Sequence, residues 1–120
     1  MKRVVIETPF AATTEAESKR NAAYLKAAML DSIRLGEAPY ASHAIYAQFL
    51  DDTIAEERSR GIMMGFVWGD MAEATVVYVD LGITKGMRAG VDYAHSKGRP
   101  VIYREVPGWY EENRQDLLGL

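Results

Sequence analysis

The sequence predicts one small α/β domain in which a parallel sheet lies between two layers of helix. β-branched apolar runs alternate along the chain with segments of helical periodicity, the pattern of parallel strands joined by crossover helices. The length of 120 residues is that of one domain, and the 48 % of hydrophobic residues suffice for one core. We therefore expect a single three-layer domain over residues 1–120, with a mainly parallel sheet of four to five strands.

The first strand and helix are predicted by residue type and by capping signals. Residues 3–7 are a β-branched run that stops before Pro9, which is typical of a buried strand. A helix of about six turns then begins at Thr14, because Thr14 and Glu17 form a capping box and apolar residues recur at helical spacing. Gly36 is expected to end it.

The middle of the chain predicts one short strand and two helices. Residues 38–43 read as a brief strand that a proline confines to its start or to an edge, and residues 44–50 read as a short helix. A longer helix over residues 53–71 is expected to begin at a cap on Thr53. Its centre, residues 62–68, is apolar nearly all round, which predicts burial on more than one side, with Trp68 and the methionines in the core.

The last third predicts the strongest strand of the chain. Residues 74–80 form a continuous β-branched run that ends in an acid, and a helix over residues 84–96 follows. Residues 99–103 are the fourth strand, and residues 109–118 are a last amphipathic helix or a tail whose Trp109 and Tyr110 could form an exposed oligomer face. This order of elements favours a flavodoxin- or Rossmann-like domain.

Composition and charge exclude several classes of function. The formal net charge of −3 provides no basic field for a nucleic-acid polymer. The absence of cysteine excludes disulfides, thiolate nucleophiles and cysteine-based metal sites. His43 and His95 lie on different elements, so neither a metal site nor a cofactor is expected. No apolar run approaches the roughly 18 residues of a membrane span, which makes the cytoplasm the expected location.

Polar and small residues follow the third strand, at the edge where parallel sheets of this class bind ligands. Asp80 ends the strand, and Gly82, Thr84, Gly86 and Met87 open the next helix. Glycines let a ligand approach the backbone, and a helix N-terminus favours an anion. The alternative is structural: Thr84 caps the helix and Gly82 only turns the chain.

Two further groups follow the other strands. Ser42, His43, Asp51 and Asp52 lie after the second strand, where a histidine near a carboxylate and with a pKa near neutrality could transfer protons. The alternative is that Ser42 caps a helix and that the two aspartates belong to a loop.

After the first strand come Glu7, Pro9 and Phe10, and Asn21 lies on the following helix within reach of the same cleft. Phe10 could stack on a nucleobase or could equally fill the core.

A family resemblance rests on several motifs taken together. They are Glu-Thr-Pro-Phe (7–10), Ala-Pro-Tyr-Ala-Ser-His (38–43), Leu-Asp-Asp (50–52) with Glu-Glu-Arg (56–58), and Asp-Leu-Gly-Ile-Thr-Lys-Gly-Met (80–87). Together they resemble the nucleoside 2-deoxyribosyltransferase-like superfamily, and more closely an uncharacterised branch common in phages and bacteria. The resemblance covers residues 3–104. It implies cleavage or exchange of the bond between a base and deoxyribose, a nucleoside or nucleotide as the ligand, and a homo-oligomer.

The resemblance also places the family's nucleophile, a glutamate, on the helix after the third strand, where this chain has Gly90. Asp92, the nearest carboxylate, should face away, since two residues of helix turn the chain by about 200°. The catalytic carboxylate could have moved to Asp80, Asp51, Asp52 or Glu7. Of these we expect Asp80 or Glu7 to act, with His43 in proton transfer. The alternative is a protein that binds a nucleotide without cleaving it, as a sensor or by sequestering it.

Overall fold

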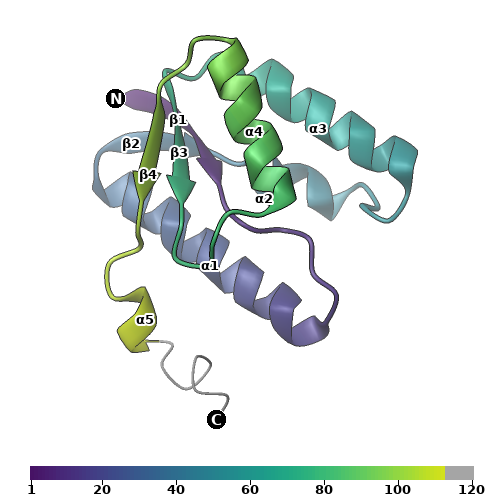
Figure 1. The fold of residues 1–120 in the computed structure, drawn as a ribbon, viewed down its shortest axis with the longest axis horizontal. Helices are drawn as coiled ribbons and strands as arrows, with labels where there is room; N and C mark the ends of the chain where they lie inside the picture. The colour runs from purple at the N-terminus through teal and green to yellow at the C-terminus, as the bar shows by residue number, and fades with distance from the viewer. Residues whose placement is uncertain (113–120) are drawn as a thin grey trace.

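The computed structural model describes residues 1–112 and contains a four-stranded, wholly parallel sheet. The strands are β1 (Lys2–Glu7), β2 (Glu37–Tyr40), β3 (Ala74–Tyr78) and β4 (Val101–Arg104), in the spatial order β2-β1-β3-β4. β1 therefore lies inside the sheet between β2 and β3, as Figure 1 shows. The predicted α/β class with a mainly parallel sheet is confirmed.

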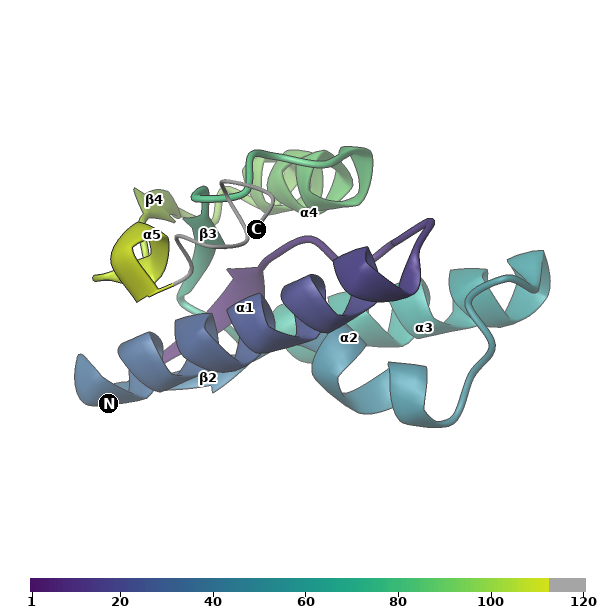
Figure 2. The ribbon, with the colours of Figure 1, turned by 90° about the horizontal axis from the view of Figure 1, so that it is seen from below.

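Helices cover both faces of the sheet, which completes the three predicted layers. The long helices are α1 (Glu15–Arg34), α3 (Ala55–Gly69) and α4 (Lys85–Ser96); the short ones are α2 (Ser42–Ile45), the 3₁₀ turn η1 (Tyr46–Gln48) and α5 (Trp109–Glu112). α1 and α4 lie on opposite sides of the sheet (Figure 2). No helix within residues 1–112 is long and apolar enough to cross a membrane.

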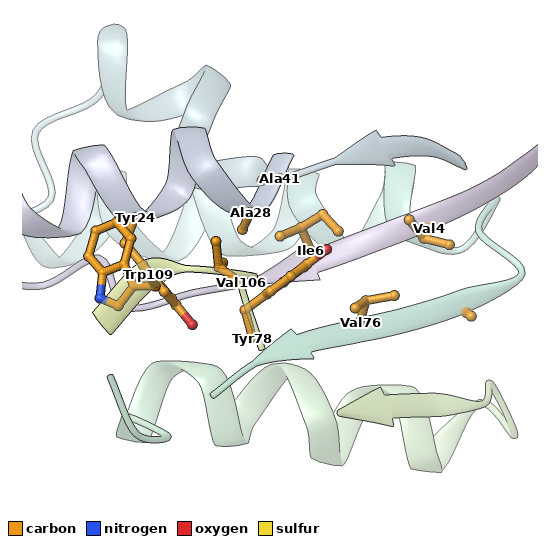
Figure 3. Packing of buried hydrophobic residues seen from close by; sticks show 10 residues of the cluster. Val4, Ile6, Tyr24, Ala28, Ala41, Val76, Tyr78, Val106 and Trp109 are labelled. Atoms are coloured by element: carbon orange, nitrogen blue, oxygen red, sulfur yellow. The ribbon is translucent and has the colours of Figure 1, made fainter. Parts of the chain in front are cut away.

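The main core lies between the sheet and α1. Val4 and Ile6 of β1 and Val76 and Tyr78 of β3 pack there with residues of α1, and Figure 3 shows how they meet. Since successive side chains of a strand point to opposite faces, the odd-numbered residues of β1 and β3 face α3 and α4. Val77, Met87 and Val91 form a smaller cluster on that side. Burial of each large apolar side chain contributes about 1.5–3 kcal/mol.

Asp80 lies on the α1 side and holds the C-terminal segment against the core. Its Oδ2 atom accepts hydrogen bonds from the Tyr24 hydroxyl at 2.5 Å and from the Val106 backbone N–H at 2.8 Å, and its own N–H donates to the Tyr24 oxygen at 2.8 Å. The Tyr110 hydroxyl donates to the Asp80 carbonyl oxygen. Trp109 is only 6 % exposed and packs edge-on against Tyr24, so the prediction of an exposed Trp109 was wrong. The remainder of the predicted last helix lies outside the described residues.

The centre of α3 also differs from its prediction. We expected burial on more than one side, yet Met63, Val67 and Trp68 are 65 %, 64 % and 62 % exposed. The helix begins at Ile54 without a side-chain cap, because the Thr53 hydroxyl donates instead to Asp51 Oδ1 at 2.6 Å. By contrast, Thr14 and Thr84 cap α1 and α4 as the sequence predicts.

Candidate functional site

A cavity of about 580 Å³ lies between the sheet and the helices α3 and α4. Its lining comes from the end of β1, from β2, from the α2 and η1 segment, from the glycines of α3, from the start of α4 and from Arg99 before β4. The volume falls in the range of small-molecule sites, and the position beside the carboxyl end of a central strand is typical of ligand sites in parallel sheets.

Glycines on one face of α3 make room for this cavity. Gly61, Gly65 and Gly69 recur at every fourth residue, so they share one face of the helix, and all three line the cavity. A Cβ atom on Gly65 would lie 2.8 Å from the Ser42 Cβ, and one on Gly69 would lie 3.3 Å from a methyl of Val5. Larger residues here would press on α2 and on the sheet.

The carboxyl group of Glu7 lies against Gly90, and both residues line the cavity. Glu7 comes from the C-terminal end of β1 and Gly90 from the second turn of α4. A Cβ atom on Gly90 would lie 2.6 Å from the Glu7 Cδ and 2.9 Å from its Oε1. Real Cβ atoms do not approach other atoms so closely, so a side chain at residue 90 and the Glu7 carboxyl group could not both occupy this space.

Burial keeps a proton on Glu7. Removal from water raises the pKa of the Glu7 carboxyl from its usual 4.5 to about 8, although the positive charge of Arg99 acts in the opposite direction. At pH 7 the group is therefore mostly a neutral acid that can both donate and accept a hydrogen bond.

His43 and Phe10 form another part of the wall. His43 Nε2 shares a 2.8 Å hydrogen bond with Thr8 Oγ1, and the ring of Phe10 meets the imidazole edge-on, with centroids 5.9 Å apart. Burial lowers the pKa of His43 from 6.5 to about 4. The expectation of a pKa near neutrality was wrong, because removal of the imidazole from water disfavours its charged form.

The start of α4 lines the cavity at Thr84, Lys85, Gly86 and Met87. Thr84 Oγ1 accepts from the Met87 N–H at 3.2 Å, while the Thr84 N–H meets the Met87 sulfur at 3.4 Å. Thr84 therefore caps the helix, which was the structural alternative, and it also borders the cavity.

Ser42 and Asp52 join Glu7, Phe10 and His43 in the lining, but five other candidates do not: Pro9, Asn21, Asp51, Asp80 and Gly82. The amide of Asn21 donates to the carbonyls of Phe10 and Ala11 and so holds the loop behind the wall. Gly82 adopts φ = +86°, which suits a glycine in a turn.

Asp80 does not line the cavity, because successive residues of a strand point to opposite faces of the sheet. It continues the even-numbered face of β3, which points to α1, whereas the cavity lies on the odd-numbered face. Its carboxylate is occupied by Tyr24 and Val106. Of the two carboxylates expected to replace the missing glutamate, only Glu7 faces the cavity.

Other lining residues were not among the candidates that the sequence indicates: Tyr40, Thr75, Tyr93 and Arg99. Strand alternation could have found Thr75, which pairs in register with Val5 and shares its face. No sequence pattern indicated Arg99, because its position depends on how the loop after α4 packs against the end of α3. Among residues 1–112 no group of three or more histidines and carboxylates could hold a metal ion.

The contact between Glu7 and Gly90 predicts a strong energetic coupling. Gly90→Ala should destabilise the wild-type fold, because the new methyl group meets the buried carboxyl. In a Glu7→Ala background the same change should be neutral or should stabilise α4 by up to about 1 kcal/mol, the usual gain of alanine over glycine in a helix. Urea unfolding of the four proteins measures the coupling; equal effects of Gly90→Ala in both backgrounds would contradict the contact.

The raised pKa of Glu7 predicts that stability falls as pH rises. Between pH 4.5 and about 8 the unfolded chain releases the Glu7 proton while the folded protein keeps it. The free energy of unfolding then decreases by at most about 1.4 kcal/mol for each pH unit. Glu7→Gln should lack this loss, so its stability relative to wild type should grow with pH. His43, whose pKa is lowered, acts in the opposite sense and cancels in the comparison. A difference independent of pH would refute the burial of Glu7.

Comparisons with known proteins give a fold relative and a family. The structure is similar to that of a 2-deoxyribosyltransferase from the psychrotolerant bacterium Bacillus psychrosaccharolyticus, described as a biocatalyst for the synthesis of nucleosides. The TM-score is 0.63 and the identity 13 %, with 84 % of this chain and 70 % of that chain covered, so the likeness concerns the fold. No curated protein matches the chain. A model for a domain of unknown function, DUF7768, matches residues 2–104, and the chain belongs to that family.

Proposed function

We propose that the cavity binds a nucleoside or nucleotide and that Glu7 attacks its anomeric carbon, in an N-glycosidase or 2-deoxyribosyltransferase reaction. The observation that carries the proposal is the Glu7 carboxyl group against Gly90. The family resemblance expects a glutamate on α4 at residue 90, and here a carboxyl group reaches the same place from β1. The fold shared with a 2-deoxyribosyltransferase supports the choice of substrate.

The proposed reaction is a double displacement, as in retaining glycosidases. An ionised Glu7 oxygen bonds to C1′ while the bond from C1′ to the base nitrogen breaks, and the base leaves with the electron pair and takes up a proton from solvent water. Water, which gives up a proton to solvent, or a second base then attacks C1′ and releases the carboxylate. Phe10 provides a ring for the base, and the start of α4 provides backbone N–H groups for the sugar or phosphate. His43, neutral at pH 7, orients the ligand by hydrogen bonding and does not carry the proton.

The protonation of Glu7 favours a second candidate function. With a pKa of about 8, roughly one tenth of the molecules hold the ionised form at pH 7. A neutral carboxyl group hydrogen-bonds to a base or sugar but does not attack carbon. The same cavity would then bind a nucleotide without cleaving it, as a sensor or sequestering protein.

Turnover assays separate these functions. Incubation with 2′-deoxynucleosides and their 5′-monophosphates should release free base, detected by chromatography, and Glu7→Gln should reduce the rate by about a thousandfold or more. Because ionised Glu7 is the reactive form, kcat/KM should rise with pH to a plateau above about 8. Glu15→Gln, on the exposed start of α1, is the matched control and should keep full activity.

The outcomes are distinct. Thermal stabilisation by a ligand without release of base supports the binding function, and neither stabilisation nor release contradicts both functions. A rate that falls with rising pH would make Glu7 a proton donor and would remove it as the nucleophile.

We also propose that the chain forms a dimer through the outer face of α3. Arg60, Met63, Val67 and Asp70 lie on one exposed stripe of this helix by its periodicity. An antiparallel two-fold contact would set Met63 against Val67 of the partner subunit and Arg60 against Asp70 of the partner subunit. Met63 and Val67, which are 65 % and 64 % exposed, form the apolar centre of this stripe.

Val67→Glu should therefore convert a dimer into a monomer, because it buries two like charges near the two-fold axis. Light scattering coupled to size exclusion measures the mass. Ile33→Glu, at an equally apolar exposed site on α1, should leave the dimer intact. A monomeric wild-type protein, or dissociation by both variants, would refute this interface.

A further inference from the structure

The cavity extends past Glu7 to a deeper end that the proposed reaction does not use. This inner end lies beneath the last turn of α3 and is lined by Val5, Thr75, Gly69 and Arg99. Thr75 pairs with Val5 across β1 and β3, so their side chains share the face that α3 covers. A Cβ atom on Gly69 would lie 3.3 Å from Val5 and 3.5 Å from the Arg99 guanidinium, which brings strand, helix and arginine together.

Two polar atoms at this inner end are buried without a partner. The hydroxyl of Thr75, a residue only 1 % exposed, and the Nε of Arg99 have no hydrogen-bond partner among the described residues. An unsatisfied buried polar group costs about 1–3 kcal/mol. A valine would fill the place of Thr75 on this β-strand with nearly the same shape and without that cost, so the hydroxyl has no evident role in folding.

The inner end is also positively charged. Arg99 donates through Nη1 to the Gly69 carbonyl and lies 5.8 Å from the centre of the Tyr93 ring, but it forms no ion pair within the described part of the chain. Glu7, the carboxyl group that influences it through space, is mostly neutral at pH 7. Glu57 and Arg58, at the other end of α3, lie about 17 Å along the helix from Gly69.

We propose that the inner end of the cavity binds an anionic oxygen group, a carboxylate or a phosphate, through the Arg99 Nε–H and the Thr75 hydroxyl. Both groups donate hydrogen bonds, and the fixed charge of the guanidinium selects an anion. The site is separate from the start of α4, where the sugar or phosphate of the proposed substrate would lie. The inference does not rest on the glycosidic reaction, since binding at Arg99 needs no catalytic group.

The Arg99 Nε–H resonance in a ¹H–¹⁵N spectrum tests this directly, with Arg99→Lys used to assign it. Acetate and phosphate are titrated separately at pH 6.5, where Glu7 is mostly protonated, against sodium chloride at matched ionic strength. We expect a saturable shift with at least one of the two anions; the anion that saturates identifies the carboxylate or phosphate chemistry. Thr75→Ser should keep the affinity, and Thr75→Val should lower it by about tenfold, the value of one hydrogen bond to a charged group.

Stability measurements distinguish a loss of anion binding from a loss of folding. Without an anion, Thr75→Val should unfold at the same temperature as wild type or at a higher one, because it removes an unsatisfied polar group. The proposal is overturned if neither anion gives a saturable shift beyond that of chloride, if Thr75→Val binds as tightly as wild type, or if Thr75→Val is clearly less stable, which would mean that the hydroxyl has a partner within the fold.

Discussion

The contact between the Glu7 carboxyl group and the bare backbone of Gly90 is the constraint on which the site depends. It brings the end of a central strand against the second turn of α4, and it leaves no room for a side chain at residue 90. Burial of the carboxyl group at this position raises its pKa to about 8. The packing of Glu7 therefore determines where the acid lies, why residue 90 is a glycine, and why the acid is mostly protonated at neutral pH.

α3 determines the rest of the cavity and also the outer surface. Its glycines turn toward the sheet, so the helix covers the cavity without filling it. Met63, Val67 and Trp68 of the same helix are mostly exposed, whereas Ile62 and Phe66 line the cavity. The spacing of the three glycines therefore accounts for the space beneath the helix.

Most of the fold could be predicted from local sequence, because its signals are local. β-branched runs identified β1, β3 and β4, a short segment around Pro39 indicated β2, and Thr14 and Thr84 marked the starts of α1 and α4. The prediction for α3 was wrong because hydrophobicity alone does not distinguish an apolar side chain that is buried from one that is exposed. The Thr53 hydroxyl donates a hydrogen bond to Asp51 and does not cap the helix. The spacing of the residues does not reveal this competing hydrogen bond.

Several residues that the sequence indicates line one cavity: Glu7, Phe10, His43 and the start of α4. The sequence-based prediction placed Asp80 in the cleft because it used only the position of Asp80 at a strand end. It did not consider to which face of the sheet the side chain points. Strand alternation could have found Thr75, although no motif marked it, whereas Arg99 depends on how distant segments pack. A titration of the Glu7 carboxyl carbon by ¹³C NMR tests the account most directly. Burial against Gly90 predicts a midpoint near 8, and a midpoint near 4.5 would show that the carboxyl group lies in water and would contradict the account.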